Sequence, residues 1–373
     1  MKVDFYTSKR EYKEKKAEFD SAIQAVIESG NFILGNQVAE FEKAVQEYTG
    51  AKHAIGVASG TDALVIASDI LGFKDGKEVI TSPFTFLASA SCIIRHKGKP
   101  VFVDIDEETF SIDVNKIEEK VNENTVGILP IHLFNQIADM DKIMDIASRH
   151  NLKVLEDAAE AFGMRWKGNG TEYKSSGCIG DFGVYSFFPT KTLGGYGDGG
   201  MIVTNDDELA RLARSYRVHG ASKKYHYDFI GYNSRLDALQ AAVLSVKLKY
   251  IDEAIKKREE VAKLYTERLS EIEEIKIPKV KGDQKHVYYV FNILVQNRDG
   301  LAEHLKKNEI GYSIYYPMPL HMQKAFQYLG YKEGDFPVAE RISKEIIALP
   351  IYPEITTEEI EFVCDTIKNF YRK

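Results

Sequence analysis

One lysine of this chain lies among neighbours that could give it chemistry. Lys191 follows an aromatic, apolar stretch that contains Tyr185, Phe187 and Phe188, and a glycine-rich loop comes after it. Apolar neighbours disfavour the charged form of an amine, and an uncharged amine can attack a carbonyl carbon to form an imine. Most lysines are simple surface residues, so this hypothesis needs support from the rest of the chain.

A short turn is the second candidate. Ser59, Gly60 and Thr61 lie between a predicted strand over residues 53–57 and a predicted helix that begins near residue 62. Free N–H groups and the helix dipole attract an anion at such a turn, and glycine allows a ligand to approach the backbone closely. A plain N-cap by Ser59 or Thr61 would explain the same residues.

Two more side chains follow predicted strands. Asp157 ends the apolar segment KVLED, and Phe86 comes shortly after the segment EVIT. Ligands of open α/β sheets bind at the carboxyl ends of strands, so the acid would face the ligand and the ring could stack on a planar group. The alternatives are a cap or surface role for Asp157 and a core position for Phe86. Glu156 is not expected to act with Asp157, because adjacent strand residues face opposite sides.

An amine, an acid, an anion-binding turn and an aromatic ring together match the needs of pyridoxal 5′-phosphate. The lysine would form the imine, the carboxylate would hold the ring nitrogen and the N–H groups would bind the phosphate. The glycines at 195, 197 and 200 also fit the spacing of a dinucleotide site. A strand is predicted after Gly200, however, where a dinucleotide site requires a helix.

A sheet must position these residues. Short apolar strands alternate with helices of about ten residues from residue 38 to residue 157, which is typical of a mostly parallel sheet covered on both faces. We predict an α/β fold with a large domain over residues 1–245 and a smaller C-terminal α+β domain over 246–373. One unbroken helix is predicted from about residue 235 to 272, and another over 114–121.

The composition argues against several classes of function. A net charge of −7 disfavours nucleic acid or an anionic membrane as the main partner. The three cysteines lie far apart, fit neither a disulfide framework nor a metal site, and suit a reducing compartment. No signal peptide is visible, and no run approaches the roughly 18 apolar residues of a membrane helix. We therefore expect a soluble, cytoplasmic protein without a metal.

Ordered motifs along almost the whole chain resemble those of one family. They include VASGTDAL, SPFTFLASA, VLEDAAEAFG, YSFFPTKTLGGYGDGG and GYNSRLDALQAAVL. In these motifs the chain is similar to the sugar aminotransferases of the DegT/DnrJ/EryC1/StrS group, which have the aspartate-aminotransferase fold (PLP fold type I). The resemblance implies an enzyme that uses pyridoxal 5′-phosphate to transfer an amino group.

The resemblance also implies roles for individual residues. Lys191 would be the catalytic lysine that forms the imine and moves protons. The implied cofactor-binding residues are Gly60, Thr61, Phe86, Asp157, Glu160, Ser186, Lys191 and Asn233. The residues implied to contact the sugar or the nucleotide are Arg235, Tyr315, Tyr316 and His321. Asn233 would reach the cofactor of a neighbouring subunit, which implies a homodimer with shared active sites. Glu160 stands where many relatives carry Gln or His.

The substrate is implied in the same way. TKTLGGYGDGG and NSRLDALQAA are most similar to enzymes that aminate C3 of a UDP- or dTDP-linked 3-keto sugar. Our hypothesis for the reaction is a transamination with L-glutamate as donor and 2-oxoglutarate as product. Tyr315 occupies a position where many of these relatives have His. The alternatives are amination at C4, amination of a cyclitol ketone of the scyllo-inosose type, and a non-catalytic cofactor-binding regulator. A dehydratase of the same fold ranks behind, because such relatives replace the lysine with histidine.

Overall fold

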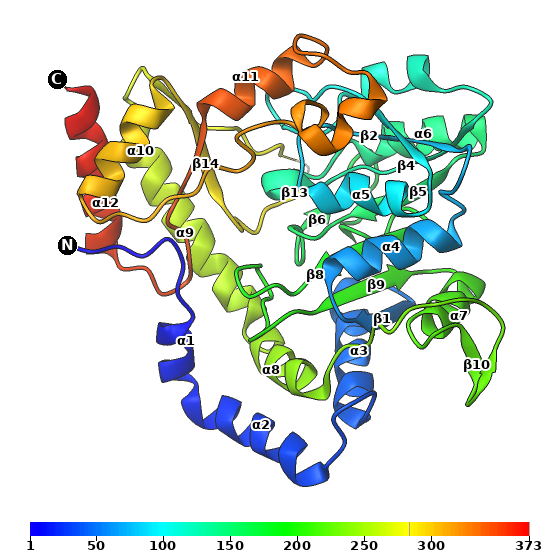
Figure 1. The fold of residues 1–373 in the computed structure, drawn as a ribbon. Helices are drawn as coiled ribbons and strands as arrows, with labels where there is room; N and C mark the ends of the chain where they lie inside the picture. Colours follow the sequence, from blue (N-terminus) through cyan, green and yellow to red (C-terminus); the bar gives the residue numbers. More distant parts are fainter. Residues whose placement is uncertain (283, 373) are drawn as a thin grey trace.

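A seven-stranded sheet forms the centre of the larger part of the molecule in the computed structural model, which describes residues 1–282 and 284–372 (Figure 1). Its strands are β1 (His53–Val57), β2 (Glu78–Thr81), β3 (Lys99–Phe102), β4 (Thr125–Ile128), β5 (Lys153–Asp157), β8 (Phe182–Ser186) and β9 (Gly200–Thr204). Their order is β1-β9-β8-β5-β4-β2-β3, and only β9 runs against its neighbours among the described strands of this sheet. The predicted mostly parallel α/β sheet is confirmed.

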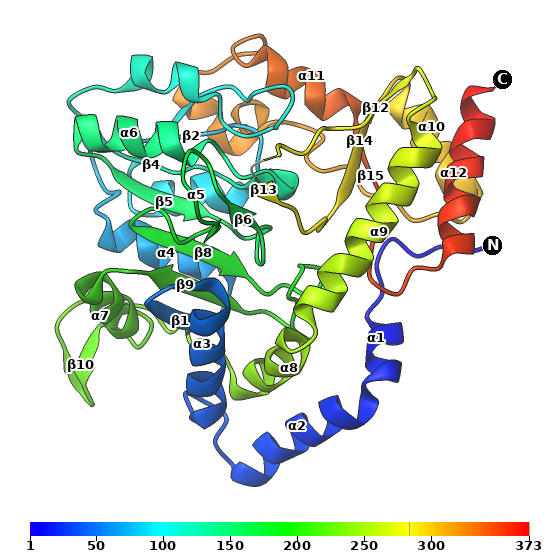
Figure 2. The same ribbon diagram turned by 180° about the vertical axis from the view of Figure 1, so that it is seen from behind.

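Helices cover both faces of this sheet (Figures 1 and 2). One core contains residues of α4 (Gly60–Ile70), α5 (Leu87–Arg95) and α7 (Asp207–Tyr216), and the other contains residues of α3 (Asn36–Thr49), α6 (Met140–His150) and α8 (Ala238–Leu248). Val154 belongs to the second core and the adjacent Leu155 to the first. Side chains of a strand alternate between faces, so a buried strand must be apolar on both sides.

A second, smaller sheet packs near the carboxyl end of the chain. It joins β12 (Ile275–Lys276), β14 (Phe291–Val295) and β15 (Ile346–Leu349) in antiparallel pairs. Around it lie α9 (Ile251–Leu269), α10 (Arg298–Lys307), α11 (Pro337–Glu345) and α12 (Thr357–Tyr371). The short pairs β6 (Arg165–Trp166), β7 (Lys174–Ser175) and β13 (Gln284–Lys285) link residues near 284 to the larger part. The proposed domain division at residue 245 stays a prediction, and this residue lies within α8.

The N-terminal segment is an arm that runs along the molecule. Its first residues lie beside α12, and α1 (Lys9–Glu14) and α2 (Lys16–Ser29) then lead away to α3 (Figures 1 and 2). Phe19 and Val26 are buried on α2, which packs against α8. On the opposite side, β10 (Ala221–Lys223) and β11 (His226–Tyr227) form a hairpin that projects from the body.

Two predicted helices differ from the structure. The predicted helix over residues 235–272 is two helices, α8 and α9, with the break at Lys249 and Tyr250. The two helices pack on different partners, since α8 lies on α2 and α3 whereas α9 lies on α12. The predicted helix over 114–121 is two short 3₁₀ turns, Val114–Lys116 and Glu118–Lys120.

In the described part of the chain, no helix combines the length and the apolar character that crossing a membrane would require.

Candidate active site

The candidate lysine lies in the connection between β8 and β9. The Lys191 amide N–H donates to Phe188 O at 2.8 Å, and Gly195 N–H donates to Phe187 O at 2.8 Å. A Cβ atom on Gly194 would lie only 2.3 Å from Pro189 O, so this tight loop requires glycine there. The Lys191 side chain is 15 % exposed. Lys191 is therefore a largely enclosed amine held by a compact loop.

Two neighbours define the surroundings of the amine. Lys191 Nζ donates to Glu160 Oε1 at 3.2 Å, and the same nitrogen lies 4.5 Å from the centroid of the Tyr289 ring. The second carboxylate oxygen of Glu160 accepts from Phe134 N–H at 3.2 Å. Tyr289 lies with its hydroxyl 3.3 Å from Thr190 Oγ1. Sequence reasoning missed Tyr289, because an aromatic residue next to an apolar strand is usually part of the core.

Asp157 lies at the carboxyl end of β5, as predicted. It is 5 % exposed, Oδ2 accepts from Ser89 Oγ at 2.7 Å, and Oδ1 accepts from Ala159 N–H at 3.1 Å. Burial raises the pKa of Asp157 above its ordinary value, and the hydrogen bonds from Ser89 and Ala159 act in the opposite direction. A carboxylate has about four acceptor positions, so this one can accept a further donor. The sequence hypothesis did not include Ser89, one turn after Phe86 on α5.

The turn at residues 59–61 opens α4. Ser59 caps the helix by accepting from Asp62 N–H at 3.0 Å, so the N-cap alternative holds for this residue. The first N–H groups of a helix have no carbonyl partner within it and remain suited to an anion. A Cβ on Gly60 would lie 2.7 Å from Ser186 Cβ, which shows how closely the turn approaches the end of β8. Ser234 supports the turn, since it accepts from Ala58 N–H and donates to Asp62 Oδ2.

Three further predicted residues lie on the surface of the chain. Phe86 is 59 % exposed at the start of α5, so it is not part of the core. Asn233 is exposed and accepts a hydrogen bond from Arg235. Asn233 and Arg235 both adjoin Ser234, whose hydrogen bond to Asp62 attaches their segment to the turn at residues 59–61. An exposed ring can stack on a ligand, and the pair at 233 and 235 is accessible to a second molecule.

The other three residues predicted to contact the sugar or the nucleotide, Tyr315, Tyr316 and His321, lie on the C-terminal side. Tyr316 stacks on Phe134 with centroids 5.8 Å apart, and Tyr315 lies 5.9 Å from the same ring. Phe134 in turn donates its N–H to Glu160. His321 is 1 % exposed and its Nε2 lies 3.0 Å from Glu340 Oε1, so it lies inside this part of the chain.

Glu156 has a separate, structural role. Its carboxylate accepts from Gly177, Ile179 and Gly180 N–H groups and lies 2.9 Å from His132 Nε2. These contacts hold the loop before β8, on the face of the sheet opposite to Asp157.

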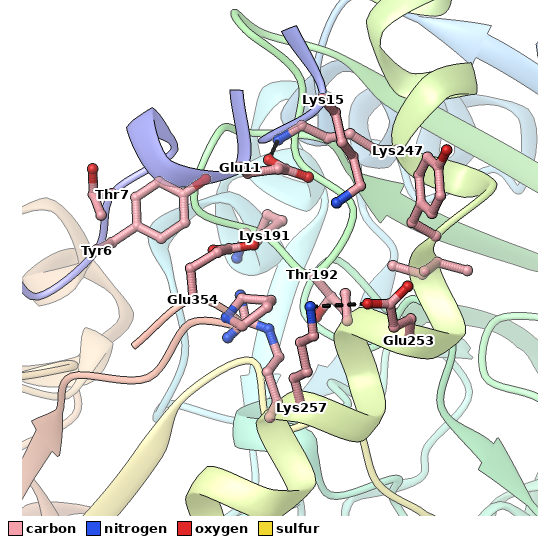
Figure 3. A pocket seen from close by; sticks show the side chains of 15 residues that line it. Tyr6, Thr7, Glu11, Lys15, Lys191, Thr192, Lys247, Glu253, Lys257 and Glu354 are labelled. Carbon is pink, nitrogen blue, oxygen red and sulfur yellow. Dashed lines mark ion pairs between the residues drawn. The ribbon is translucent and has the colours of Figure 1, made fainter. Parts of the chain in front are cut away.

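A narrow cavity adjoins Lys191 and Thr192 (Figure 3). Its other walls come from the N-terminal arm, from α8 and α9, and from Pro353 and Glu354. Two ion pairs cross its lining, Lys247 with Glu11 at 2.8 Å and Lys257 with Glu253 at 2.9 Å. The lining is strongly charged, and the N-terminal arm is thus part of the surroundings of Lys191.

These residues fit pyridoxal 5′-phosphate by the chemistry of their donor groups. Asp157, Ser186 and the turn at residues 59–61 follow or end parallel strands, so they meet at one edge of the sheet together with the loop of Lys191. An enclosed amine can form an imine, a buried carboxylate with free acceptor positions can hold a ring N–H, and a helix start can bind phosphate. Fold and site therefore define a pyridoxal-phosphate-dependent enzyme of fold type I.

The particular family is shown by comparison with known proteins. The model of the DegT/DnrJ/EryC1/StrS aminotransferase family matches residues 13–368. The chain belongs to this family and is a pyridoxal-phosphate-dependent aminotransferase.

Relatives of several descriptions share this similarity over nearly their full length. The chain is 45% identical over 377 residues to a pleiotropic regulatory protein of Geobacillus stearothermophilus, covering 100% of this chain and 99% of that one. It is 37% identical to UDP-2-acetamido-2-deoxy-3-oxo-D-glucuronate aminotransferase of Pseudomonas aeruginosa (98% and 100% covered). It is 41% identical to dTDP-3-amino-3,6-dideoxy-alpha-D-galactopyranose transaminase of Aneurinibacillus thermoaerophilus (95% of each). The crystal structure of S. venezuelae DesV in complex with a ketimine intermediate superposes with a TM-score of 0.95 at 35% identity, covering 100% and 99%.

Proposed function

We propose that this aminotransferase transfers an amino group from L-glutamate to the C3 keto group of a UDP- or dTDP-linked sugar. The observation that carries the proposal is the enclosed Lys191 amine between the Glu160 carboxylate and the Tyr289 ring. Two relatives, at 37% and 41% identity, are named for 3-oxo or 3-amino nucleotide sugars, one UDP-linked and one dTDP-linked. Their similarity supports a nucleotide-linked keto sugar as the substrate class and does not distinguish UDP from dTDP.

The residues of the chain have distinct tasks in this proposal. When bound, pyridoxal phosphate supplies the carbonyl group that takes up nitrogen and a conjugated ring that accepts an electron pair from the substrate. Lys191 Nζ takes the proton from the amino-bearing carbon of the donor and returns it during the second half of the reaction. Glu160 orients this amine and balances its charge, and Asp157 keeps a proton on the ring nitrogen. The turn at residues 59–61 and Ser186 would hold the phosphate, and Phe86 would stack on the ring.

A homodimer with shared active sites is part of the proposal. Asn233 is exposed and Arg235 partly exposed, and the buried Ser234 between them attaches both to the turn at residues 59–61. We infer that Asn233 reaches the cofactor phosphate of the partner subunit and that Arg235 contacts its sugar nucleotide. On the C-terminal side, Tyr315 and Tyr316 would line the sugar site, whereas the enclosed His321 would support that loop through Glu340.

Turnover with a panel of sugars tests the proposal. Purified protein with bound cofactor is given L-glutamate and, separately, 3-keto and 4-keto sugars linked to UDP or dTDP, and a scyllo-inosose-type ketone. The expected result is 2-oxoglutarate together with a sugar that carries its new amine at C3. A product aminated only at C4, or turnover only with the cyclitol ketone, would contradict it. Lys191→Ala is the control for uncatalysed amine exchange.

A regulatory function is the second candidate, since a relative 45% identical to this chain is described as a pleiotropic regulatory protein. Both candidates predict cofactor binding, but only the enzyme converts L-glutamate to 2-oxoglutarate in a single turnover. Glutamate is added to the cofactor-loaded protein. A loss of the absorbance of the lysine–cofactor imine, together with the formation of one equivalent of 2-oxoglutarate, would favour the enzyme. A stable absorbance with no keto acid would favour the regulator.

A further inference from the structure

The N-terminal arm contacts the loop of Lys191 on both sides of the lysine. On one side, Tyr6 donates its hydroxyl hydrogen to Pro189 O at 2.6 Å, two residues before Lys191. On the other side, Phe19 and Tyr12 pack against Tyr196, with ring centroids 5.2 and 6.4 Å away. The loop between Pro189 and Tyr196 is therefore bracketed by one segment that lies more than 170 residues earlier in the sequence.

A partly buried ion pair strengthens the second of these contacts. Glu11 Oε2 lies 2.8 Å from Lys247 Nζ, and the same Lys247 nitrogen lies 5.0 Å from the centroid of the Tyr196 ring. Lys247 is 7 % exposed, so its charge depends on Glu11 and the ring for stabilisation. Figure 3 shows Tyr6 and Glu11 on the arm and Lys191 and Lys247 around the same cavity.

The same arm is attached to the C-terminal part of the chain. Val3 N–H donates to Glu309 O at 3.0 Å, and Gly311 N–H donates to Val3 O at 2.8 Å. Arg10 forms a two-pronged pair with Glu359 at 2.7 and 2.5 Å. The Phe5 ring lies 6.4 Å from the ring of Tyr315, a residue of the proposed sugar site.

The Tyr6 hydroxyl links the N-terminal arm directly to the backbone of the Lys191 loop. Burial raises the pKa of Tyr6 to about 12, and the charge of Glu11 adds to this effect, so the hydroxyl stays protonated and can donate even well above neutral pH. The Pro189 carbonyl lies inside the tight loop, where a Cβ on Gly194 would approach it to 2.3 Å. A donor on this carbonyl restrains the backbone that carries Lys191.

We propose that Tyr6 is a positioning residue for Lys191, and that residues 3–19 act as a strap that fixes the Lys191 loop relative to the C-terminal part of the chain. The expected effect of Tyr6 on the reaction rates rests on the proposed function. The placement of the loop itself can be measured without cofactor or substrate.

The experiment compares Tyr6→Phe with Tyr12→Phe. Tyr12 lies on the same segment, and its hydroxyl donates to the exposed Asp20, so Tyr12→Phe removes a phenolic hydrogen bond that does not touch the loop. Hydrogen–deuterium exchange is measured on the cofactor-free chain at the amides of Lys191 and Gly195. We expect exchange to be about five- to tenfold faster in Tyr6→Phe, which corresponds to the loss of one hydrogen bond of about 1 kcal/mol, and unchanged in Tyr12→Phe.

A second variant tests the strap. Arg10→Gln loosens the attachment to Glu359 and touches no residue between 187 and 196 in the described contacts. We expect a two- to threefold faster exchange at the same two amides. Exchange equal to wild type in both Tyr6→Phe and Arg10→Gln would overturn the proposal.

Kinetics separate positioning from general destabilisation. In the cofactor-loaded enzyme, Tyr6→Phe should lower kcat about fivefold and leave the KM of the sugar close to wild type, because Tyr6 holds the lysine in place. A kcat equal to that of Tyr12→Phe would overturn the role in catalysis. If the wild-type protein is inert towards every sugar tested but exchange is still faster in Tyr6→Phe than in wild type, the proposed substrate is contradicted and the placement of the loop is still supported.

Discussion

Lys191 Nζ and Glu160 Oε1 lie 3.2 Å apart, and their side chains are only 15 and 8 % exposed. An ion pair with so little contact with water is stable only when hydrogen bonds satisfy both partners. Glu160 meets this condition, because its other oxygen accepts from Phe134 N–H. Phe134 has a left-handed backbone with a φ of 48°, an uncommon conformation for a residue with a side chain. The position of the lysine amine thus depends on a loop that stacks against the proposed sugar site.

Lys191→Ala should abolish transamination. The variant loses the imine-forming amine and the group that moves the proton, and one proton-transfer group alone contributes about 10² to 10⁴ in rate. We expect the rate to fall by more than about a thousandfold. Lys191→Arg keeps a cation beside Glu160 and should be equally inactive, which distinguishes chemistry from charge. The measurement is 2-oxoglutarate formation, and wild-type turnover in either variant would exclude Lys191 as the catalytic residue.

Glu160→Gln should slow the reaction without abolishing it. The amide keeps an oxygen that can accept from Lys191, but it lacks the negative charge that balances the amine, and a hydrogen bond to a charged group contributes about 1.5–3 kcal/mol. A loss in kcat of about tenfold or more is expected. Glu119→Gln, on the exposed surface, is the matched control. Equal rates in the two variants would show that Glu160 does not assist the lysine.

Asp157→Asn should change stability in opposite directions with and without cofactor. Burial raises the pKa of Asp157 in the folded chain, so the folded state binds the proton more tightly than the unfolded state does. The ionised carboxylate therefore costs stability, and this cost develops as the pH rises from the usual value of about 4 through the raised pKa of the folded chain. Without cofactor, Asn removes this cost, and the melting temperature at pH 7 should rise.

With cofactor, the same variant should lose stability relative to wild type. The cationic ring nitrogen loses its partner, and breaking a buried pair costs about 3–5 kcal/mol, or roughly two to four decades in rate if the loss falls on the transition state. Thermal melts with and without pyridoxal phosphate test both statements. A cofactor-induced rise in melting temperature as large as in wild type would contradict the assignment.

Gly60→Ala should damage the anion-binding turn. The new Cβ would lie 2.7 Å from Ser186 Cβ and 3.2 Å from its Cα, so one of two backbone segments would have to move. Overpacking of this kind costs about 1–3 kcal/mol, and the movement falls on the N–H groups proposed to bind phosphate. The control is Gly282→Ala, where no atom lies within 4 Å of the new methyl group. Titration with pyridoxal phosphate should show weaker binding only in Gly60→Ala.

Much of the fold could be predicted because local patterns agree with the tertiary structure. The strand before Asp157 is apolar on both faces because both are covered by helices, and Gly50 ends α3 with a φ of 78°, as a left-handed glycine does. The break at Lys249 and Tyr250 could not be predicted, since no glycine or proline marks it. It arises where the chain changes its packing partner, from α2 and α3 to α12, which is a property of the assembled molecule.

The candidate site, like the fold, could be predicted from the sequence only in part. Asp157 and Gly60 could be found because Asp157 ends β5 and Gly60 follows β1, and these two strands run in the same direction, so their carboxyl ends meet at one edge of the sheet. Tyr289 and Tyr6 could not, because Tyr289 lies 98 residues after Lys191 and Tyr6 lies 185 residues before it. Only the packing of the C-terminal part and of the N-terminal arm brings these rings to the lysine.

His286 should make the stability of the cofactor-free chain depend on pH between about 6.5 and 3. It is 8 % exposed, its Nδ1 accepts from Tyr288 N–H at 3.0 Å, and burial lowers its pKa from 6.5 to about 3. The folded state thus excludes a proton that the unfolded state binds, so stability is present above pH 6.5 and is lost as the pH falls towards 3. At pH 5 the difference amounts to about 2 kcal/mol.

The variant His286→Gln cannot take up this proton. Its free energy of unfolding, measured with urea, should fall by about 2 kcal/mol less than that of wild type between pH 7.5 and pH 5. His226→Gln, on the exposed hairpin, should keep the wild-type dependence. Comparing each protein with itself at two pH values removes any overall cost of the substitution. If His286→Gln and wild type lost equal stability over this range, the unfolded chain would not be binding an extra proton at His286.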